Sequence, residues 1–454
     1  MKQIFNPSEL ADFARYYGFH YDCCDPETLI RDFCIDMERG LSGQSSGMPM
    51  LPSHIYLKNS VPPGKKALAL DAGGTNLRAA VVSFGTDGKP VVQGLRNAAM
   101  PGTTGRLSAS QFYDELAGVC APLLEEYSGI EGVGFCFSYP METTEDGDAI
   151  PFEFTKEVDA PDVAGKPVGK SLRDALARRG VKAPEHITLL NDTTATLLTG
   201  LAQIPPNIPS KIEGLSGSCT KQNTGGAVIG FILGTGFNTA YPETVIKKIN
   251  FESKTSPQIV VCESGNFYNR YQGVLDREFD AATKNPGAYS TEKMSAGAYL
   301  GLLSLHILKR AVGEGVLKFK KSTELLAMNR LGTKDLNAFL NNPLSFNGAL
   351  GDLFSPDETD AISSLVYLES IITERAAVFS AATLAAVIQH TGEGKDQLKP
   401  VRIAVDGTTF AIYHFMRESI EAHLRVMLNA SSPHFFIMSK VEQASLLGAA
   451  VAAL

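Results

Sequence analysis

The pattern of apolar and polar positions divides the chain into alternating strand-like and helix-like segments. Short apolar runs typical of buried strands occur at 66–73, 77–84, 132–140 and 186–192. Helical spacing of apolar residues predicts helices at 7–18, 25–40, 108–127 and 167–180, with Asn6 as a cap of the first. Strands that alternate with helices predict an α/β architecture.

A second unit repeats the plan of the first. "GAVIGFILGTGFNTAYPE" at 226–243 places a glycine and threonine corner between two apolar runs, as "ALALDAGGTNLRAAVVSF" does at 67–84. A third strand and corner, "VRIAVDGTTF", follows a long helical run at 368–390, and a helix of small residues is predicted at 442–454. The repetition predicts two related halves that face each other.

Two segments rich in glycine, serine and proline interrupt this pattern. "LSGQSSGMPMLPSHI" at 41–55 is interpreted as a connector, so that the strands begin near Ala67. The segment 204–226 has no periodicity and is predicted to be an exposed loop.

Length and composition narrow the class of protein. A chain of 454 residues favours two domains over one, and 44% apolar with 20% charged residues excludes a disordered chain. A net charge of −8 argues against nucleic acid or an anionic membrane as a partner. Seven scattered cysteines indicate neither a disulfide framework nor a zinc site. With no secretory signal and no window approaching the roughly 18 apolar residues of a membrane span, the expected location is cytoplasmic.

The corner "DAGGTN" at 71–76 carries candidate chemistry. Backbone N–H groups of a glycine-rich corner can bind phosphate without a net positive charge, and Asp71 can hold magnesium through water. The alternative is a hairpin turn whose glycines only permit a positive φ. The corner matches neither a Walker loop nor a dinucleotide fingerprint, because the corner itself contains no Gly-Lys-Ser/Thr and a strand follows it at once.

Four motifs in order, "DAGGTNLR", "LLNDTTAT", "LGTGFN" and "VDGTTF", resemble the phosphate, connecting and adenosine elements of the sugar kinase, heat-shock protein and actin superfamily. Within it, "SGMPMLPSHI", "GFCFSYP", "PFEFTKE", "VCESGNF" and "NPGAYSTEKMSAGAYLG" are similar to elements of the hexokinase family. The resemblance extends over roughly residues 45–450.

The resemblance implies a two-domain, actin-like ATPase (ribonuclease H-like) α/β fold with the active site in a cleft. The small domain would comprise 64–195 and 440–454, and the large domain 1–63 and 196–439. It also implies transfer of the γ-phosphoryl of Mg-ATP to the 6-hydroxyl of glucose or a related hexose. Asp192 would be the general base, and Lys156 and Arg78 would neutralise the phosphoryl charge.

The same resemblance implies two sets of binding residues. The expected hexose ligands are Ser138, Thr155, Lys156, Asn191, Asp192, Gly236, Asn238, Glu263 and Glu292. The expected nucleotide ligands are Asp71, Gly73, Gly74, Thr75, Asn76, Gly234, Thr235, Gly407, Thr408 and Ser445, with Asp71 also holding Mg²⁺ through water. The expected partners are hexose and ATP, without nucleic acid or membrane, and the sequence fixes no oligomeric state.

Several alternatives stay open. An Asn-Asp pair before a helix, as at 191–192, is by itself more often a cap. The last helix carries Leu446 and Leu447 where the family usually has a glycine-rich basic run, which predicts an altered nucleotide pocket and leaves room for another phosphoryl donor. Tyr139 and Tyr289 replace a usual phenylalanine and glutamine. A non-catalytic sugar sensor and an actin-like or chaperone-like ATPase are the rival functions.

Overall fold

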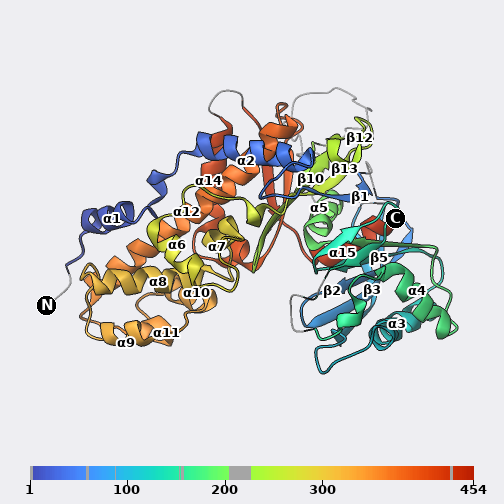
Figure 1. The fold of residues 1–454 in the computed structure, drawn as a ribbon, viewed down its shortest axis with the longest axis horizontal. Coiled ribbons are helices and arrows are strands. Elements are labelled where there is room, and N and C mark those ends of the chain that lie inside the picture. The colour runs from blue at the N-terminus through green and yellow to red at the C-terminus, as the bar shows by residue number, and fades with distance from the viewer. Residues whose placement is uncertain are drawn as a thin grey trace, which may run out of the picture.

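The computed structural model describes residues 4–57, 61–86, 88–152, 154, 158–203, 226–429 and 433–454. Its strands form two principal sheets, which lie in different parts of the molecule (Figure 1). The predicted loop at 204–226 falls outside the described residues except for Gly226.

The first sheet has five strands in the order β4-β3-β2-β5-β8. The strands are β2 (Lys66–Ala72), β3 (Asn76–Phe84), β4 (Pro90–Ala99), β5 (Ile130–Phe137) and β8 (His186–Leu190). The strand β3 runs antiparallel to both β2 and β4, whereas β5 is parallel to β2 and β8 is parallel to β5.

The second sheet has six strands in the order β1-β13-β10-β9-β14-β15. The strands are β1 (Leu51–Tyr56), β9 (Val228–Leu233), β10 (Phe237–Glu243), β13 (Gln258–Val261), β14 (Val401–Asp406) and β15 (Phe436–Lys440). The strands β9 and β10 form an antiparallel hairpin, and β14 runs parallel to β9 and to β15. Two further pairs are β6 (Met141–Thr143) with β7 (Ala149–Pro151) and β11 (Val245–Ile246) with β12 (Phe251–Glu252).

The two sheets share one topology, because β13-β10-β9-β14-β15 repeats the order and directions of β4-β3-β2-β5-β8. Each of the two predicted glycine-rich corners connects the two antiparallel central strands of its sheet. The internal repeat that the sequence predicted is therefore present in the structure as two sheets with the same strand order and directions. We propose that the two sheets mark the small and large domains expected from the sequence.

Helices cover both sheets. Those around the five-stranded sheet are α3 (Ala109–Glu126), α4 (Val168–Arg178) and α15 (Ala444–Ala453), with the short η2 (Pro161–Val163), whereas α5 (Asp192–Gln203) packs mainly against the six-stranded sheet. The others are α1 (Pro7–Tyr16), α2 (Pro26–Leu41), α6 (Val274–Ala281), α7 (Ser290–Ser295), α8 (Leu300–Gly313), α9 (Ser322–Ala327), α10 (Thr333–Asn341), α11 (Gly348–Gly351), α12 (Thr359–Thr391), α13 (Thr408–Ile412) and α14 (Met416–Leu428). Three further single turns are η1 (Tyr21–Cys23), η3 (Lys247–Ile249) and η4 (Ser264–Asn266).

Among the described residues, three large apolar cores hold these layers together. One lies between the five-stranded sheet and α3 with α4, and a much larger one surrounds α12 and one face of the six-stranded sheet. The third core joins α5 and α15 to residues of both sheets, so these two helices lie between the sheets (Figure 1). Gly134 permits this contact, because a Cβ there would lie 1.7 Å from the carbonyl oxygen of Ala449 on α15.

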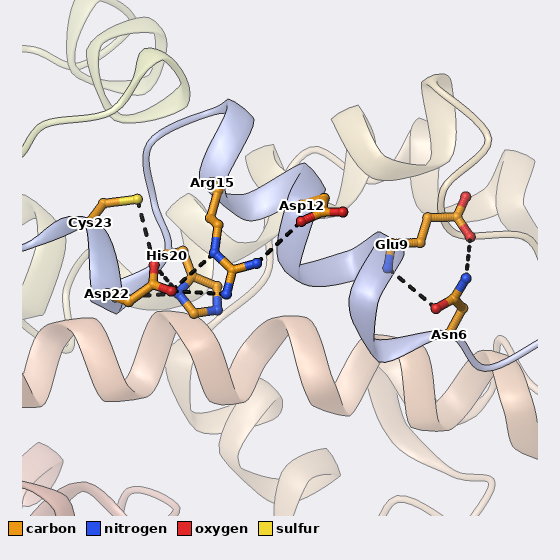
Figure 2. Close-up of polar contacts among 7 residues, drawn as sticks. All are labelled: Asn6, Glu9, Asp12, Arg15, His20, Asp22 and Cys23. Carbon is orange, nitrogen blue, oxygen red and sulfur yellow. Dashed lines mark hydrogen bonds and ion pairs between the residues drawn. The ribbon is translucent and has the colours of Figure 1, made fainter.

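The N-terminal helix confirms its predicted cap. The side chain of Asn6 accepts a hydrogen bond from the N–H of Glu9 at 3.3 Å, which satisfies one of the free donors of the first turn. At its other end, Arg15 pairs with Asp22 of η1 at 2.9 Å, so the two segments are connected at the surface (Figure 2).

The first strand begins earlier than the sequence predicted. The segment 41–55 is not a surface connector, because Leu51–Tyr56 forms β1 at the edge of the six-stranded sheet. Proline at position 52 is compatible with an edge strand, which has one side without ladder hydrogen bonds. Met48 and Met50 are fully buried, so the segment also contributes to the large core.

The expectation that no segment is as apolar as a membrane span was wrong for α12. Within the described residues, this is the one helix whose length and composition would allow it to cross a membrane, with a mean hydropathy of 1.6 over 18 residues. Since 94% of that window is buried inside the protein, the apolar run is explained by its place at the centre of the large core.

Candidate active site

The first corner lies between β2 and β3 and is held by three contacts. The N–H of Gly73 donates to the carbonyl of Asn76 at 3.0 Å, and the carbonyl of Thr75 accepts from Met100 at 2.9 Å. The hydroxyl of Tyr139 donates to the carbonyl of Gly73 at 2.8 Å. Gly73 does not have a positive φ, so at this position glycine is not explained by the simple hairpin-turn alternative.

Asp71 and Arg78 face each other across this corner. They are register partners on β2 and β3, and Nε of Arg78 donates to Oδ2 of Asp71 at 2.8 Å. Asp71 is almost fully buried, whereas 38% of the Arg78 side chain is exposed. The sequence indicated separate roles for the two residues, at a metal ion and at the phosphates, and gave no sign that they form an ion pair.

The second and third corners lie together. Thr409 donates through Oγ1 to the carbonyl of Gly234 at 2.9 Å, and the N–H of Gly297 donates to the same carbonyl at 2.8 Å. Gly407 has a φ of +124°, and a Cβ there would lie 2.2 Å from the carbonyl oxygen of Leu233. Only glycine fits this close approach. The predicted nucleotide residues Gly234, Thr235, Gly407 and Thr408 are therefore neighbours, and Thr408 is exposed.

The predicted hexose residues of the six-stranded sheet also meet. Nδ2 of Asn238 donates to Oε1 of Glu263 at 2.9 Å, while Oδ1 of Asn238 accepts from the N–H of Ser264 at 3.2 Å. Glu292 accepts from the N–H of Phe237 at 3.0 Å. Gly236 allows this approach, because a Cβ there would lie 3.1 Å from Oε2 of Glu292.

Asp192 lies within electrostatic reach of both glutamates. Burial raises the pKa of Glu263 to about 7, and the charges of Asp192 and Glu292 act in the same direction. Burial also raises the pKa of Glu292, with a further contribution from Asp192, whereas the N–H of Phe237 acts against it. The structure thus brings three carboxyl groups of the predicted set together.

Asn191 and Asp192 occupy the start of α5. Oδ1 of Asn191 accepts a hydrogen bond from the N–H of Thr194 at 2.8 Å, so the capping interpretation of this pair is correct for Asn191. Asp192 is the first residue of the helix. Its carboxylate lies at the positive end of the helix dipole, which favours an anion there.

Cys136 connects the two sides and was not singled out in the sequence. It is the register partner of Asp71 on β2 and of Leu190 on β8, so these side chains share one face of the sheet. Its Sγ lies 4.0 Å from Oγ of Ser138, and the thiol is fully buried. Burial raises the pKa of Cys136, and the charges of Asp71 and Asp192 add to this. The cysteine therefore lies close to both the predicted metal residue and the predicted base.

The remaining predicted residues are placed as follows. Ser445, near the start of α15, lies against the thiol of Cys136. Thr75 and Asn76 are exposed at the first corner, and Gly74 is partly buried beside them. Thr155 and Lys156 lie outside the described residues. The side chains of Leu446 and Leu447 are only 1% and 2% exposed, and both belong to the core between the sheets. The altered nucleotide pocket that they suggested stays a prediction.

Comparison with known proteins identifies the family. Two models, both described as "Hexokinase", match residues 18–202 and 228–454, and the second alone covers half of the chain. The chain belongs to the hexokinase family. The predicted actin-like α/β fold is confirmed by the hexokinase of Schistosoma mansoni complexed with glucose, which is 22% identical, covers 99% of both chains and has a TM-score of 0.73.

Two curated relatives illustrate the range of this hexokinase family. Hexokinase-2 of Equus caballus is 28% identical over 440 residues, which are 91% of this chain and 45% of the relative. Hexokinase-2 of Candida albicans is 27% identical over 453 residues, 94% of this chain and 87% of the relative. The chain thus spans about half the length of the mammalian hexokinase and most of the yeast one.

Proposed function

We propose that the protein transfers the γ-phosphoryl group of Mg-ATP to the 6-hydroxyl of glucose or a related hexose. The observation that carries this proposal is the convergence of Asn238, Glu263 and Glu292 with Asp192. An amide and three carboxyls can pair with the ring of hydroxyls that a hexose presents, and a sugar lacking one hydroxyl would leave a buried partner unsatisfied.

In the proposed reaction, the 6-oxygen attacks the γ-phosphorus while the bond from the γ-phosphorus to the bridging β–γ oxygen breaks. Asp192 takes the proton of the hydroxyl, and ADP leaves with the electron pair of the broken bond. Such a base typically contributes about 10²–10⁴-fold. Arg78, which is partly exposed at the first corner, would stabilise charge on the phosphoryl group, and the sequence assigns the same task to Lys156.

Magnesium would enter with the nucleotide. Mg²⁺ is usually held by one or two carboxylates together with substrate phosphates and water, and it neutralises charge on the phosphates. Asp71 at the first corner fits this requirement, and within the described ranges no group of three or more histidine, cysteine, aspartate or glutamate side chains could hold a metal by itself. A site completed by the nucleotide is consistent with that chemistry.

The test is sugar-dependent release of ADP from Mg-ATP, with glucose, mannose, fructose and no sugar compared. We expect turnover with at least one hexose and a background rate without sugar. Sugar-independent ATP hydrolysis of equal rate would favour the actin-like or chaperone-like ATPase. Hexose binding without turnover with any nucleoside triphosphate would favour a non-catalytic sensor. The same assay with other nucleoside triphosphates and with polyphosphate identifies the phosphoryl donor. The cytoplasmic location of the protein stays a prediction.

A further inference from the structure

A buried lysine follows directly after one of the candidate sugar ligands. Lys293 is 2% exposed and lies next to Glu292 on α7. Lysine is rarely buried, because removing an ammonium group from water costs several kcal/mol unless it is paired and hydrogen-bonded. The proposed reaction uses neither this charge nor its partner, so the burial needs a separate explanation.

The contacts of Lys293 tie three segments together. Its Nζ forms an ion pair with Oδ1 of Asp280 in the last turn of α6, and it donates to the carbonyl of Asn285 at 2.6 Å. The second carboxylate oxygen of Asp280 accepts from the N–H of Gly287 at 2.8 Å. One ion pair, between buried Lys293 and partly buried Asp280, therefore fixes both the end of α6 and the loop that leads into α7.

That loop ends in a strained residue just before Glu292. Tyr289 has a φ of +57°, which is uncommon for an aromatic residue and costs of order 1 kcal/mol or more. Its carbonyl accepts the N–H of Lys293 at 2.9 Å, which closes the first turn of α7. Glu292 lies in this turn and reaches the N–H of Phe237 beside Gly236. A conformation of this kind persists only where surrounding contacts hold it.

We propose that Asp280 and Lys293 form a positioning pair that holds the turn from Tyr289 to Glu292 against the second corner, so that Glu292 is aimed at the acceptor hexose. The inference rests on the proposed function, because it assigns these residues to hexose binding. Neither residue contacts the sugar itself. The pair acts through the direction of Glu292, and its loss is felt in hexose affinity rather than in nucleotide affinity.

The test compares Lys293→Met and Lys293→Arg with a matched control. The control is Asp276→Asn. Oδ2 of Asp276 forms a buried ion pair with Nη1 of Arg375 at 2.6 Å, and neither residue belongs to the candidate site. The measurements are KM for glucose, KM for ATP, kcat and Tm. We expect Lys293→Met to raise KM for glucose about tenfold or more, with KM for ATP changed less than about threefold. Lys293→Arg should recover part of the loss, and the control should lower Tm with KM for glucose unchanged.

Two outcomes of this comparison of Lys293→Met with its control would overturn the inference. One is a folded Lys293→Met protein whose KM for glucose stays within about twofold of wild type, and the other is a control that raises KM for glucose as much. If Lys293→Met does not fold, Asp280→Asn decides, because the Asp280 side chain is 15% exposed and asparagine keeps its shape. A folded Asp280→Asn protein with unchanged KM for glucose overturns the inference, and an increase supports it. A wild-type protein without sugar-dependent turnover would instead overturn the proposed function and this inference with it.

Discussion

The carboxyl of Glu263 makes the stability of the sugar-free protein depend on pH in a direction opposite to that of ordinary surface acids. Its pKa is about 7 in the folded protein, raised mainly by burial from the ordinary value of 4.5 for a glutamate. Between these values the folded state binds a proton that the unfolded state has released. The contribution of Glu263 is therefore fully present below pH 4.5 and is lost as pH rises through 7.

The substitution Glu263→Gln removes this titration while keeping the size of the side chain and its hydrogen bonding with Asn238. The linkage relation gives a change of about 2.5 kcal/mol in the stability of the variant relative to wild type between pH 5 and pH 8. Because part of the side chain reaches solvent, screening reduces this figure, and we expect at least about 1 kcal/mol.

The assay is urea unfolding of both proteins, without sugar, at pH 5, 6, 7 and 8. The free energy of unfolding of Glu263→Gln should approach that of wild type at pH 5 and exceed it increasingly toward pH 8. Titrations shared by the two proteins cancel in the difference. A difference that is constant over the whole range, or that changes with the opposite sign, would refute the reasoning. The control is Glu252→Gln, which makes the same substitution at an exposed position of the chain.

Three further predictions follow from particular contacts. Asp192→Asn should lower kcat by about 10²–10⁴-fold in the ADP-release assay with Tm little changed, and a loss below tenfold would argue against the base. Gly134→Ala should destabilise by about 1–3 kcal/mol or more, since its Cβ would lie 1.7 Å from the Ala449 oxygen, whereas Gly105→Ala, with nothing within 4 Å, should leave the urea midpoint nearly unchanged. Glu369→Gln should become more stable relative to wild type by about 4 kcal/mol as pH rises from 4.5 to 8, because the carboxyl is 0% exposed and burial raises its pKa to about 8; a stability difference that does not change with pH would contradict this.

The elements that the sequence predicted well are those whose signal is local. Buried strands on either side of a glycine corner, and the cap at Asn6, depend on residues within a few positions of each other. The strand β1 was missed because an edge strand with a proline has the composition of a connector, and only pairing with β13 makes it a strand. The burial of Leu446 and Leu447 was not predicted, since the side of the helix that faces the core depends on two distant sheets.

The residues of the candidate site also had a local signal in the sequence, whereas the contacts that hold them did not. Its residue types came from motifs, and the structure brings Asn238, Glu263, Glu292 and Asp192 together as those motifs imply. The contacts that hold these side chains had no signal in the sequence. The hydroxyl of Tyr139 donates to the carbonyls of Gly73 and Gly74, which lie 66 and 65 residues earlier in the chain. The pairing of Asp71 with Arg78 follows only from strand register.

The two glutamates show why such contacts escape a reading of sequence. Glu263 has a φ of +57° and precedes η4, and Tyr289 has the same φ and precedes α7, which carries Glu292. Propensity would place glycine or asparagine at both positions, because a side chain destabilises this conformation. Glu263 itself carries a carboxyl of the candidate hexose site, and Tyr289 precedes the turn that carries the other one, Glu292. The local preference of the chain is thus overruled where tertiary contacts fix the direction of a functional side chain, and the pairing of Asp280 with Lys293 is one such contact.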